Sequence, residues 1–270
     1  MTRRKDHHGP YRRAVITGAS SGIGEAFAKA LPDRTDLLLT GRNDTALGEL
    51  ADALKKTGRH VERLVADLSE DKGRDSLVQA AQAFAPDLLI NNAGLGAFGR
   101  AVENEPLTER AMIEVNVVAP AVITRALLPE MLQRAREEGR RAGLVVVAST
   151  AAFQPLPYLA TYAATKAFDY FYAQGLASEL EYEPIDVLTV CPGPTKTRFF
   201  ERAGGRRQPA GSPMSSAKDV ADQALRALGR QNVVTIGASN RAYRGIAKLL
   251  PERILRGPTR RALRESFKGR

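Results

Sequence analysis

The sequence contains no tryptophan, one cysteine and three histidines, and the last two shortages exclude whole classes of protein. Because Cys191 is the only cysteine, the chain cannot form an internal disulfide bond, and a cytoplasmic location is expected. His7, His8, His60 and Cys191 lack the spacing of metal ligands, so no metal site is predicted. No apolar run approaches the roughly 20 residues that span a bilayer, and the basic N-terminus lacks the apolar stretch of a secretory signal.

The formal net charge of +10 is concentrated at the two ends of the chain. Residues 1–13 carry +4 and residues 241–270 carry +8, which leaves −2 for the residues between them. A basic nucleic-acid-binding face built into the body of the protein is therefore not expected. We interpret the chain as a basic N-terminal arm (1–13), a single folded domain (14–240) and a basic amphipathic tail (241–270).

Short apolar runs alternate with longer segments of helical periodicity. The runs at 15–17, 37–40, 61–65, 88–90, 144–148, 187–190 and 233–236 indicate seven strands that are buried on both faces. The segments at 24–31, 45–56, 76–84, 108–136, 158–182 and 217–228 indicate helices. This alternation predicts an α/β fold, a Rossmann-like doubly wound sheet of about seven parallel strands with helices on both faces. Residues 204–212 are the one long loop signal in the body and are expected to be mobile.

The first predicted strand leads directly into Thr-Gly-Ala-Ser-Ser-Gly-Ile-Gly at 17–24, which opens a helix. Glycines let backbone N–H groups approach a diphosphate, and the N-terminus of a helix stabilises its negative charge. The alternative is a tight strand–helix turn without a ligand. Three glycines in eight residues at the first crossover favour the dinucleotide-binding interpretation.

Two other patterns match known motifs, but their context argues against them. Residues 18–22 fit the Gly-x-Ser-x-Gly elbow of serine hydrolases, yet only His60 follows Ser20, and it lies just before the third strand. Residues 94–99 read Gly-x-Gly-x-x-Gly, but they follow the fourth strand and no helical pattern begins directly behind them. We interpret residues 94–99 as a loop.

The residues after the second strand bear on the choice of cofactor. Gly41-Arg42-Asn43 contains no acidic residue that would bind the ribose hydroxyls of NAD, whereas an arginine suits the 2′-phosphate of NADP. Asp44 lies nearby, and its expected role is to cap the following helix. NADP(H) is therefore favoured over NAD(H), with an ordinary exposed arginine as the alternative interpretation of Arg42.

Polar residues also follow the third and fourth strands, at the edge where such sheets bind ligands. Asp67 could accept a hydrogen bond from an adenine amine. Asn91 could serve the site or could simply form a turn, which is a common role of asparagine.

The residues that could carry chemistry lie in the second half of the chain. Tyr162 and Lys166 are four residues apart on a predicted helix and so share one face, and Ser149 ends the fifth strand. A nearby ammonium group and a positively charged nicotinamide would favour the phenolate, bringing the pKa of Tyr162 down from its usual value of about 10. An ordinary surface pair is the alternative. No lysine stands four residues after Tyr158, Tyr170 or Tyr172.

Together these residues resemble the short-chain dehydrogenase/reductase family, in its short single-domain branch. The resemblance spans roughly residues 14–236, and its motifs occur in the family's order. They are the glycine-rich segment at 17–24, Asn-Asn-Ala-Gly at 91–94, Asn116, Ser149, Tyr-Ala-Ala-Thr-Lys at 162–166 and Pro-Gly-Pro-Thr-Lys-Thr at 192–197. The basic ends of the chain exceed the family's common core.

The resemblance implies a role for each matching residue. Tyr162 would be the general acid that protonates a carbonyl oxygen, Lys166 would lower its pKa and bind the nicotinamide ribose, Ser149 would orient the substrate oxygen, and Asn116 would help hold a proton-supplying water chain. The implied cofactor-binding residues are Gly18, Ser20, Ser21, Gly22, Ile23, Gly24, Arg42, Asp67, Leu68, Asn91, Ala93, Gly94, Pro192, Gly193 and Thr195, with Tyr162 and Lys166. The implied substrate-binding residues are Phe98, Phe199 and Met214, with Ser149 and Tyr162.

The predicted function is NADP(H)-dependent interconversion of a small-molecule carbonyl and an alcohol, with a lipophilic substrate as one hypothesis. The alternatives are an NAD-dependent alcohol dehydrogenase and a non-catalytic dinucleotide sensor or nucleic-acid-associated protein that uses its basic termini. By analogy with the family, a homodimer or homotetramer is expected.

The C-terminal tail has an apolar stripe beside basic residues. The pattern is typical of a terminal helix with a solvated basic face. The apolar residues, which alternate with arginine and lysine, are Ala242, Tyr243, Ile246, Leu249 and Leu250. The competing hypothesis is weak peripheral attachment to an anionic membrane.

Overall fold

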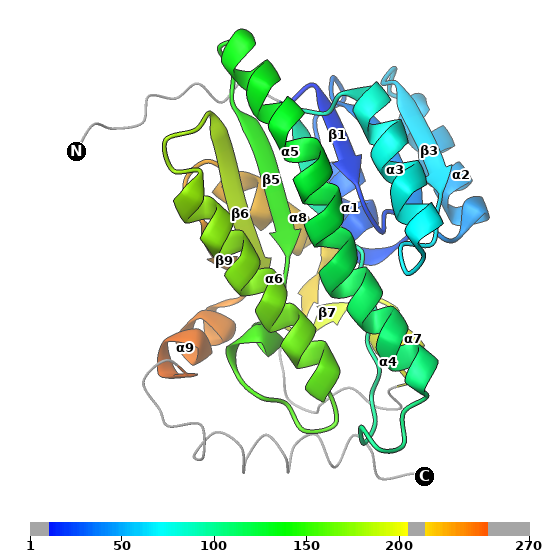
Figure 1. The fold of residues 1–270 in the computed structure, drawn as a ribbon, viewed down its shortest axis with the longest axis vertical. Helices are drawn as coiled ribbons and strands as arrows, with labels where there is room; N and C mark the ends of the chain where they lie inside the picture. Colours follow the sequence, from blue (N-terminus) through cyan, green and yellow to red (C-terminus); the bar gives the residue numbers. More distant parts are fainter. Residues whose placement is uncertain (1–10, 205–213, 248–270) are drawn as a thin grey trace.

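The computed structural model describes residues 11–204 and 214–247 and contains a seven-stranded parallel sheet (Figure 1). Its strands are β1 (Arg13–Ile16), β2 (Asp36–Gly41), β3 (Val61–Val65), β4 (Leu88–Asn91), β5 (Ala142–Val147), β6 (Ile185–Cys191) and β9 (Val233–Thr235). The order across the sheet is β3-β2-β1-β4-β5-β6-β9. The direction of winding reverses between β1 and β4, and in open α/β sheets this switch point is where ligands bind.

Helices cover both faces of the sheet, as the alternating pattern predicts. They are α1 (Gly22–Ala30), α2 (Asp44–Lys55), α3 (Asp71–Phe84), α4 (Pro106–Ile113), α5 (Ala119–Glu137), α6 (Ala160–Glu179), α7 (Phe199–Arg202), α8 (Ala217–Ala227) and α9 (Ala238–Ala247). The apolar faces of α1, α2 and α8 form one core with the sheet, and those of α3, α5 and α6 form the other. In Figure 1 the second group lies in front of the sheet, and the strands point downward toward β7 and α7.

Burial on both faces holds for the central strands but not for the edge strand β3. Every residue of β4, β5 and β6 is buried, whereas in β3 only Val61 is buried and the other side chains are partly or fully exposed. A second sheet, which the sequence pattern did not predict, pairs the two-residue strands β7 (Thr195–Lys196) and β8 (Ser215–Ser216). This pairing anchors the segment that follows β6 beside the start of α8.

The predicted ends of the folded domain fall inside regular structure. Arg13 already belongs to β1, and the backbone N–H groups of Arg12 and Arg13 donate to the carboxylate of Asp87. At the other end, α9 runs across the proposed boundary at residue 240. Residues 1–10, most of the predicted 204–212 loop and the remainder of the tail, including Leu249 and Leu250, lie outside the described residues.

The predicted helix at 108–136 is one continuous helix interrupted by a π-helical turn. α4 leads into the π-helical residues Glu114–Val118 and then α5, which continues past Pro129. Among the described residues, this helix (Pro106–Glu137) is long and apolar enough to cross a membrane by length and composition alone, with a mean hydropathy of 1.6 in an 18-residue window. That finding differs from the expectation of no such run, but the window is 44% buried, and its buried apolar side chains, such as Ile123 and Leu127, belong to the core on the α3–α5–α6 face.

Candidate active site

A cavity of about 1060 Å³ opens at the carboxyl ends of the parallel strands and crosses the switch point between β1 and β4. One end is lined by residues that follow β2 and β3, including Arg42 and Asp67. The other end is lined by Ser149, Tyr162 and Lys166. The fold therefore brings the two halves of the predicted site to one cavity.

The glycine-rich turn at 17–24 forms the floor at the centre of the cavity. Gly18 and Gly22 have φ values of +67° and +62°, a conformation that side chains disfavour. A Cβ on Gly18 would lie 2.8 Å from the Cα of Ala93. Asn92 holds the turn against the end of β4, because its Nδ2 donates to the carbonyl oxygens of Thr17 and Gly18 at 2.9 and 3.2 Å. The turn is thus a close-packed cradle that presents backbone to the cavity.

Gly24 does not line the cavity but fixes how α1 leaves this turn. A Cβ at this position would lie 2.3 Å from the carbonyl oxygen of Gly18 and 2.5 Å from Asn92 Nδ2. Gly24→Ala is therefore expected to lower the free energy of unfolding by about 1–3 kcal/mol through overpacking. Chemical denaturation measures this change.

The matched control is Gly245→Ala, because Gly245 lies inside α9 and a Cβ there would meet nothing within 4 Å. This variant should gain up to about 1 kcal/mol, since alanine is the better helix former. Equal stability of the two variants would show that the contact between α1 and the turn is not tight.

Arg42 and Asp67 face each other at the end of the cavity next to β2 and β3. Arg42 Nη1 lies 3.5 Å from Asp67 Oδ2 across two partly exposed side chains. Partial burial of Asp67 opposes ionisation, but hydrogen bonds from Ser69 and the charge of Arg42 lower its pKa overall. The backbone N–H and the hydroxyl of Ser69 both donate to Asp67 Oδ1. These hydrogen bonds hold the carboxylate in place after the end of β3.

The helix cap after β2 differs from the sequence prediction. Asn43, not Asp44, is the N-cap of α2, since its Oδ1 accepts a hydrogen bond from the backbone N–H of Ala46. Asp44 is the first helical residue and pairs with Arg63 of β3. The prediction was one residue off because Asn and Asp are about equally good caps and the sequence offers both in succession.

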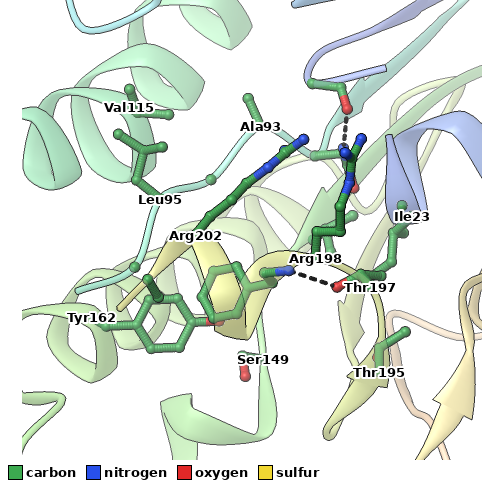
Figure 2. A pocket seen from close by; sticks show the side chains of 18 of the residues that line it. Ile23, Ala93, Leu95, Val115, Ser149, Tyr162, Thr195, Thr197, Arg198 and Arg202 are labelled. Carbon is green, nitrogen blue, oxygen red and sulfur yellow. Dashed lines mark hydrogen bonds between the residues drawn. The ribbon is translucent and has the colours of Figure 1, made fainter. Parts of the chain in front are cut away.

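Tyr162, Lys166 and Ser149 line the opposite end of the cavity, where Figure 2 shows Tyr162 and Ser149 close to each other. Lys166 is only 5% exposed, and its Nζ donates to Val147 O and to Asp169 Oδ2, both at 2.9 Å. Asp169 is itself 3% exposed, so the two charges form a buried ion pair one turn behind the tyrosine. Sequence reasoning did not single out Asp169, because acidic residues on a helix are common and usually solvated.

The protein environment of Tyr162 raises its pKa, while Lys166 acts in the predicted direction and lowers it; the further lowering expected from a nicotinamide stays a prediction. Burial is the largest cause, and the negative charge of Asp169 adds to it. The charge of Lys166 and a hydrogen bond with Ser149 act in the opposite direction but do not outweigh burial. Burial alone would lower the pKa of Lys166, yet the paired carboxylate raises it, so this lysine stays charged. The phenol is consequently protonated at neutral pH.

Asn116 lies behind the cavity wall and not on it. Its side chain has no exposed surface and sits in the π-helical turn. Its Oδ1 accepts from the N–H of Leu95, and its Nδ2 donates to Leu95 O and Thr165 Oγ1. Thr165 in turn donates to Tyr162 O, so Asn116 ties the loop after β4 to the helix that carries the tyrosine. Its role in a water chain stays a prediction.

An apolar cluster borders the cavity next to Tyr162. Phe98, Leu159 and Ala203 are buried there, and Phe199 packs 5.2 Å from the ring of Tyr162, measured between ring centroids. The cluster also includes Leu156, Tyr158 and Phe200. Residues 94–99 form the predicted loop, and the N–H of Phe98 anchors it by donating to Ala203 O.

Most of the predicted residues line the cavity, but four do not. Gly24, Asn91, Asn116 and Met214 are absent from its wall. Asn91 points into the fold instead, where its Nδ2 donates to Thr124 Oγ1 at 2.8 Å. Lining residues that sequence reasoning left unassigned include Asn92, Gln154, Leu156, Leu159 and Arg198, and Arg202 was covered only as part of the segment 199–214 expected to border the substrate. Arg198 and Arg202 lie at the two ends of α7, a four-residue helix that is too short to give a periodic signal in the sequence.

The cavity residues fit a nicotinamide dinucleotide. A glycine cradle at a helix N-terminus lies between a cationic end at Arg42 and a tyrosine–lysine pair, which suits a diphosphate flanked by two nucleosides. No group of three or more metal-ligating side chains occurs within residues 11–204 and 214–247.

Comparisons with known proteins agree with this geometry. The family model described as short chain dehydrogenase matches residues 12–207. The chain is 34% identical over 226 residues to 1-deoxy-11-beta-hydroxypentalenate dehydrogenase of Streptomyces exfoliatus, which covers 81% of this chain and 80% of that protein. It is also similar to a solved Sphingobium yanoikuyae short-chain dehydrogenase in complex with NADPH, with 29% identity, a TM-score of 0.75 and coverage of 89% and 96% of the two chains. A Burkholderia phymatum short chain dehydrogenase/reductase in complex with NAD gives 26% identity, a TM-score of 0.78 and coverage of 92% and 96%.

Proposed function

The chain belongs to the short-chain dehydrogenase family and is an oxidoreductase, and from this premise we propose that it interconverts a carbonyl and an alcohol with NADP(H) as cofactor. The observation that carries the proposal is the placement of Tyr162, Ser149 and the buried Lys166 on the wall of one cavity with the glycine-rich cradle. Proteins with this fold have many functions, so the proposal rests on these side chains and not on the sheet.

In carbonyl reduction, Tyr162 donates its hydroxyl proton to the substrate oxygen while Ser149 holds that oxygen in position. The raised pKa of Tyr162 keeps this proton on the phenol until the reaction. Lys166 then stabilises the phenolate, since its charge lowers the pKa of the neighbouring tyrosine. The dinucleotide, when bound, supplies the hydride, and the protein contributes position and the proton.

Arg42 supports NADP(H) as the cofactor, because it lines the cavity end where a dinucleotide would place its adenosine ribose. The substrate that we propose is lipophilic. The wall of the cavity next to Tyr162 is apolar. It is formed by Phe98, Leu156, Leu159 and Phe199. An apolar wall of this kind would bury a hydrophobic substituent on either side of the carbonyl.

The test is turnover of NADPH against a panel of ketones and aldehydes that vary in size and polarity. We expect consumption of NADPH with bulky apolar carbonyls, and slower consumption with small polar ones. The proposal would be contradicted if no carbonyl in the panel were reduced with NADPH and none of the corresponding alcohols were oxidised with NADP⁺.

The Lys166–Asp169 pair leads to a prediction about pH. The carboxylate of Asp169 raises the pKa of Tyr162, so Asp169→Asn should move the pH midpoint of alcohol oxidation, which needs the phenolate, to lower pH. Asparagine keeps an oxygen that can accept from Lys166 Nζ. The pH–rate profile of kcat measures the midpoint, and Asp222→Asn on the exposed pair with Lys218 is the control. An unchanged midpoint would show that Asp169 does not act on the tyrosine, whereas a midpoint that moves to higher pH would show that its main effect is to keep Lys166 charged.

We also propose that the protein forms a homodimer through the outer faces of α5 and α6. Val122 and Phe171 are 42% and 69% exposed on these two helices, which lie side by side in Figure 1. A two-fold contact through these helices would cover both side chains with the same face of a second subunit.

A further inference from the structure

We propose that Arg198 and Arg202 form a cationic clamp that closes over the diphosphate of the bound dinucleotide. The inference rests on the proposed function, because it assigns two further residues to the same cofactor. "Clamp" means these two guanidinium groups together. No motif of the sequence points to either residue.

Both arginines come from the segment that follows β7 and forms α7, and both line the cavity. Figure 2 shows their side chains extending across the cavity toward the part of the wall that carries Ile23 and Ala93. Arg202 Nη1 donates to Ser21 Oγ at 3.1 Å. Ser21 is the residue immediately before α1, so this guanidinium lies above the N-terminus of that helix.

The backbone that carries the clamp is packed on the glycine-rich turn. A Cβ on Gly22 would lie 3.1 Å from Thr197 Cγ2, which places the residue before Arg198 in close contact with the cradle. On its other side the segment is anchored by the hydrogen bond from Phe98 N to Ala203 O. The clamp is therefore held between the cradle and the substrate-side loop, directly over the position where a helix N-terminus favours phosphate.

The charge balance of the cavity singles out these two residues. The other charged lining residues have partners: Arg42 pairs with Asp67, Asp44 with Arg63 of β3, and Lys166 with Asp169. Within the part of the chain that the structure describes, no carboxylate lies within 4 Å of Arg198 or Arg202. Two positive charges with no carboxylate partner among the described residues match the two negative charges of a dinucleotide diphosphate, and guanidinium groups bind phosphate oxygens in pairs.

An anionic substrate group is the competing occupant, and the geometry argues against it. The substrate end of the cavity is apolar around Phe98, Leu159 and Phe199. The hydrogen bond to Ser21 holds Arg202 at the glycine-rich turn, away from Ser149. The clamp residues also flank Phe199, which packs on Tyr162, so a bound diphosphate would fix one wall of the substrate site.

Calorimetric titration of the full-length protein tests the clamp without any turnover. The variants are Arg198→Gln, Arg202→Gln and the double substitution, and the control is Arg110→Gln, whose side chain is 78% exposed on α4. Two probes separate the phosphates: NADP⁺ contains the diphosphate, whereas adenosine 2′-monophosphate contains only the ribose phosphate expected at Arg42. We expect the Kd of NADP⁺ to rise about tenfold in each single variant and more in the double variant. Binding of adenosine 2′-monophosphate should not change.

Each alternative result has a distinct meaning. An unchanged Kd for NADP⁺, or an equal loss for both probes, would overturn the clamp. A rise in the KM of an anionic carbonyl substrate with no change in the Kd of NADP⁺ would also overturn it and would assign the arginines to substrate. Failure of the unaltered protein to bind any dinucleotide would instead overturn the proposed function. If a glutamine variant does not fold, Arg198→Lys and Arg202→Lys keep the charge without the paired hydrogen bonds, and a smaller loss of NADP⁺ affinity is then expected.

Discussion

Replacing Tyr162 with phenylalanine is expected to lower kcat by about 10²–10⁴-fold, the usual range for a general acid or base. The ring keeps its contact with Phe199, at 5.2 Å between centroids, so the substitution removes one hydroxyl and little packing. Without that hydroxyl, no proton donor remains at the position where Ser149 orients a substrate oxygen. The Kd of NADP⁺ should change little, because the diphosphate and the adenosine end are bound elsewhere in the cavity.

Steady-state kinetics and calorimetry on the same preparation separate these two effects. Tyr170→Phe is the control, since Tyr170 lies on the same helix but has no lysine four residues on, and its ring contacts with Phe153 and Phe171 are retained. Activity of the Tyr162 variant within a few-fold of the unaltered protein would mean that another group protonates the carbonyl. A matched loss in the Tyr170 variant would point to a fault in the helix instead of in the chemistry.

The architecture of the sheet could be predicted from the sequence because its central strands are buried on both faces. The run 144–148 is continuously apolar and 187–190 contains only Thr189 as a polar residue, and β5 and β6 are indeed wholly buried. The tyrosine–lysine spacing was equally informative, since a separation of four residues on a helix fixes a shared face. The pattern was weaker elsewhere. At β3 the sequence did not predict how exposed the strand is, and it did not predict the two-residue strands β7 and β8 at all.

The parts of the site that sequence reasoning missed depend on distances between segments that are remote in the chain. Arg202 and Ser21 are separated by 181 positions, and nothing local to either residue predicts their hydrogen bond. Asp169 became informative only when burial was known, because a solvated carboxylate three residues after a lysine has little effect on its pKa. The raised pKa of Tyr162 could not be predicted either, since it is a balance between burial and two opposite charges.

Replacing Arg42 with aspartate is expected to raise the Kd of NADPH by about 10²-fold while weakening NADH much less or improving it. Charge-assisted hydrogen bonds to a phosphate contribute about 1.5–3 kcal/mol each, and the substitution replaces that attraction with repulsion. A carboxylate at the end of the second strand can instead accept hydrogen bonds from unphosphorylated ribose hydroxyls. The neighbouring Asp67 strengthens the effect, because the new carboxylate and the lost guanidinium both leave its negative charge uncompensated.

Titration of the variant with NADPH and NADH measures the change, and Arg42→Lys is the matched control that keeps the charge. Lysine should retain most of the preference for NADPH, because it still meets the phosphate as a point charge but cannot form the paired hydrogen bonds. If Arg42→Asp leaves the affinity for NADPH nearly unchanged, the arginine does not contact the 2′-phosphate. Tighter binding of NADH than of NADPH by the unaltered protein would then assign NAD(H) as the cofactor.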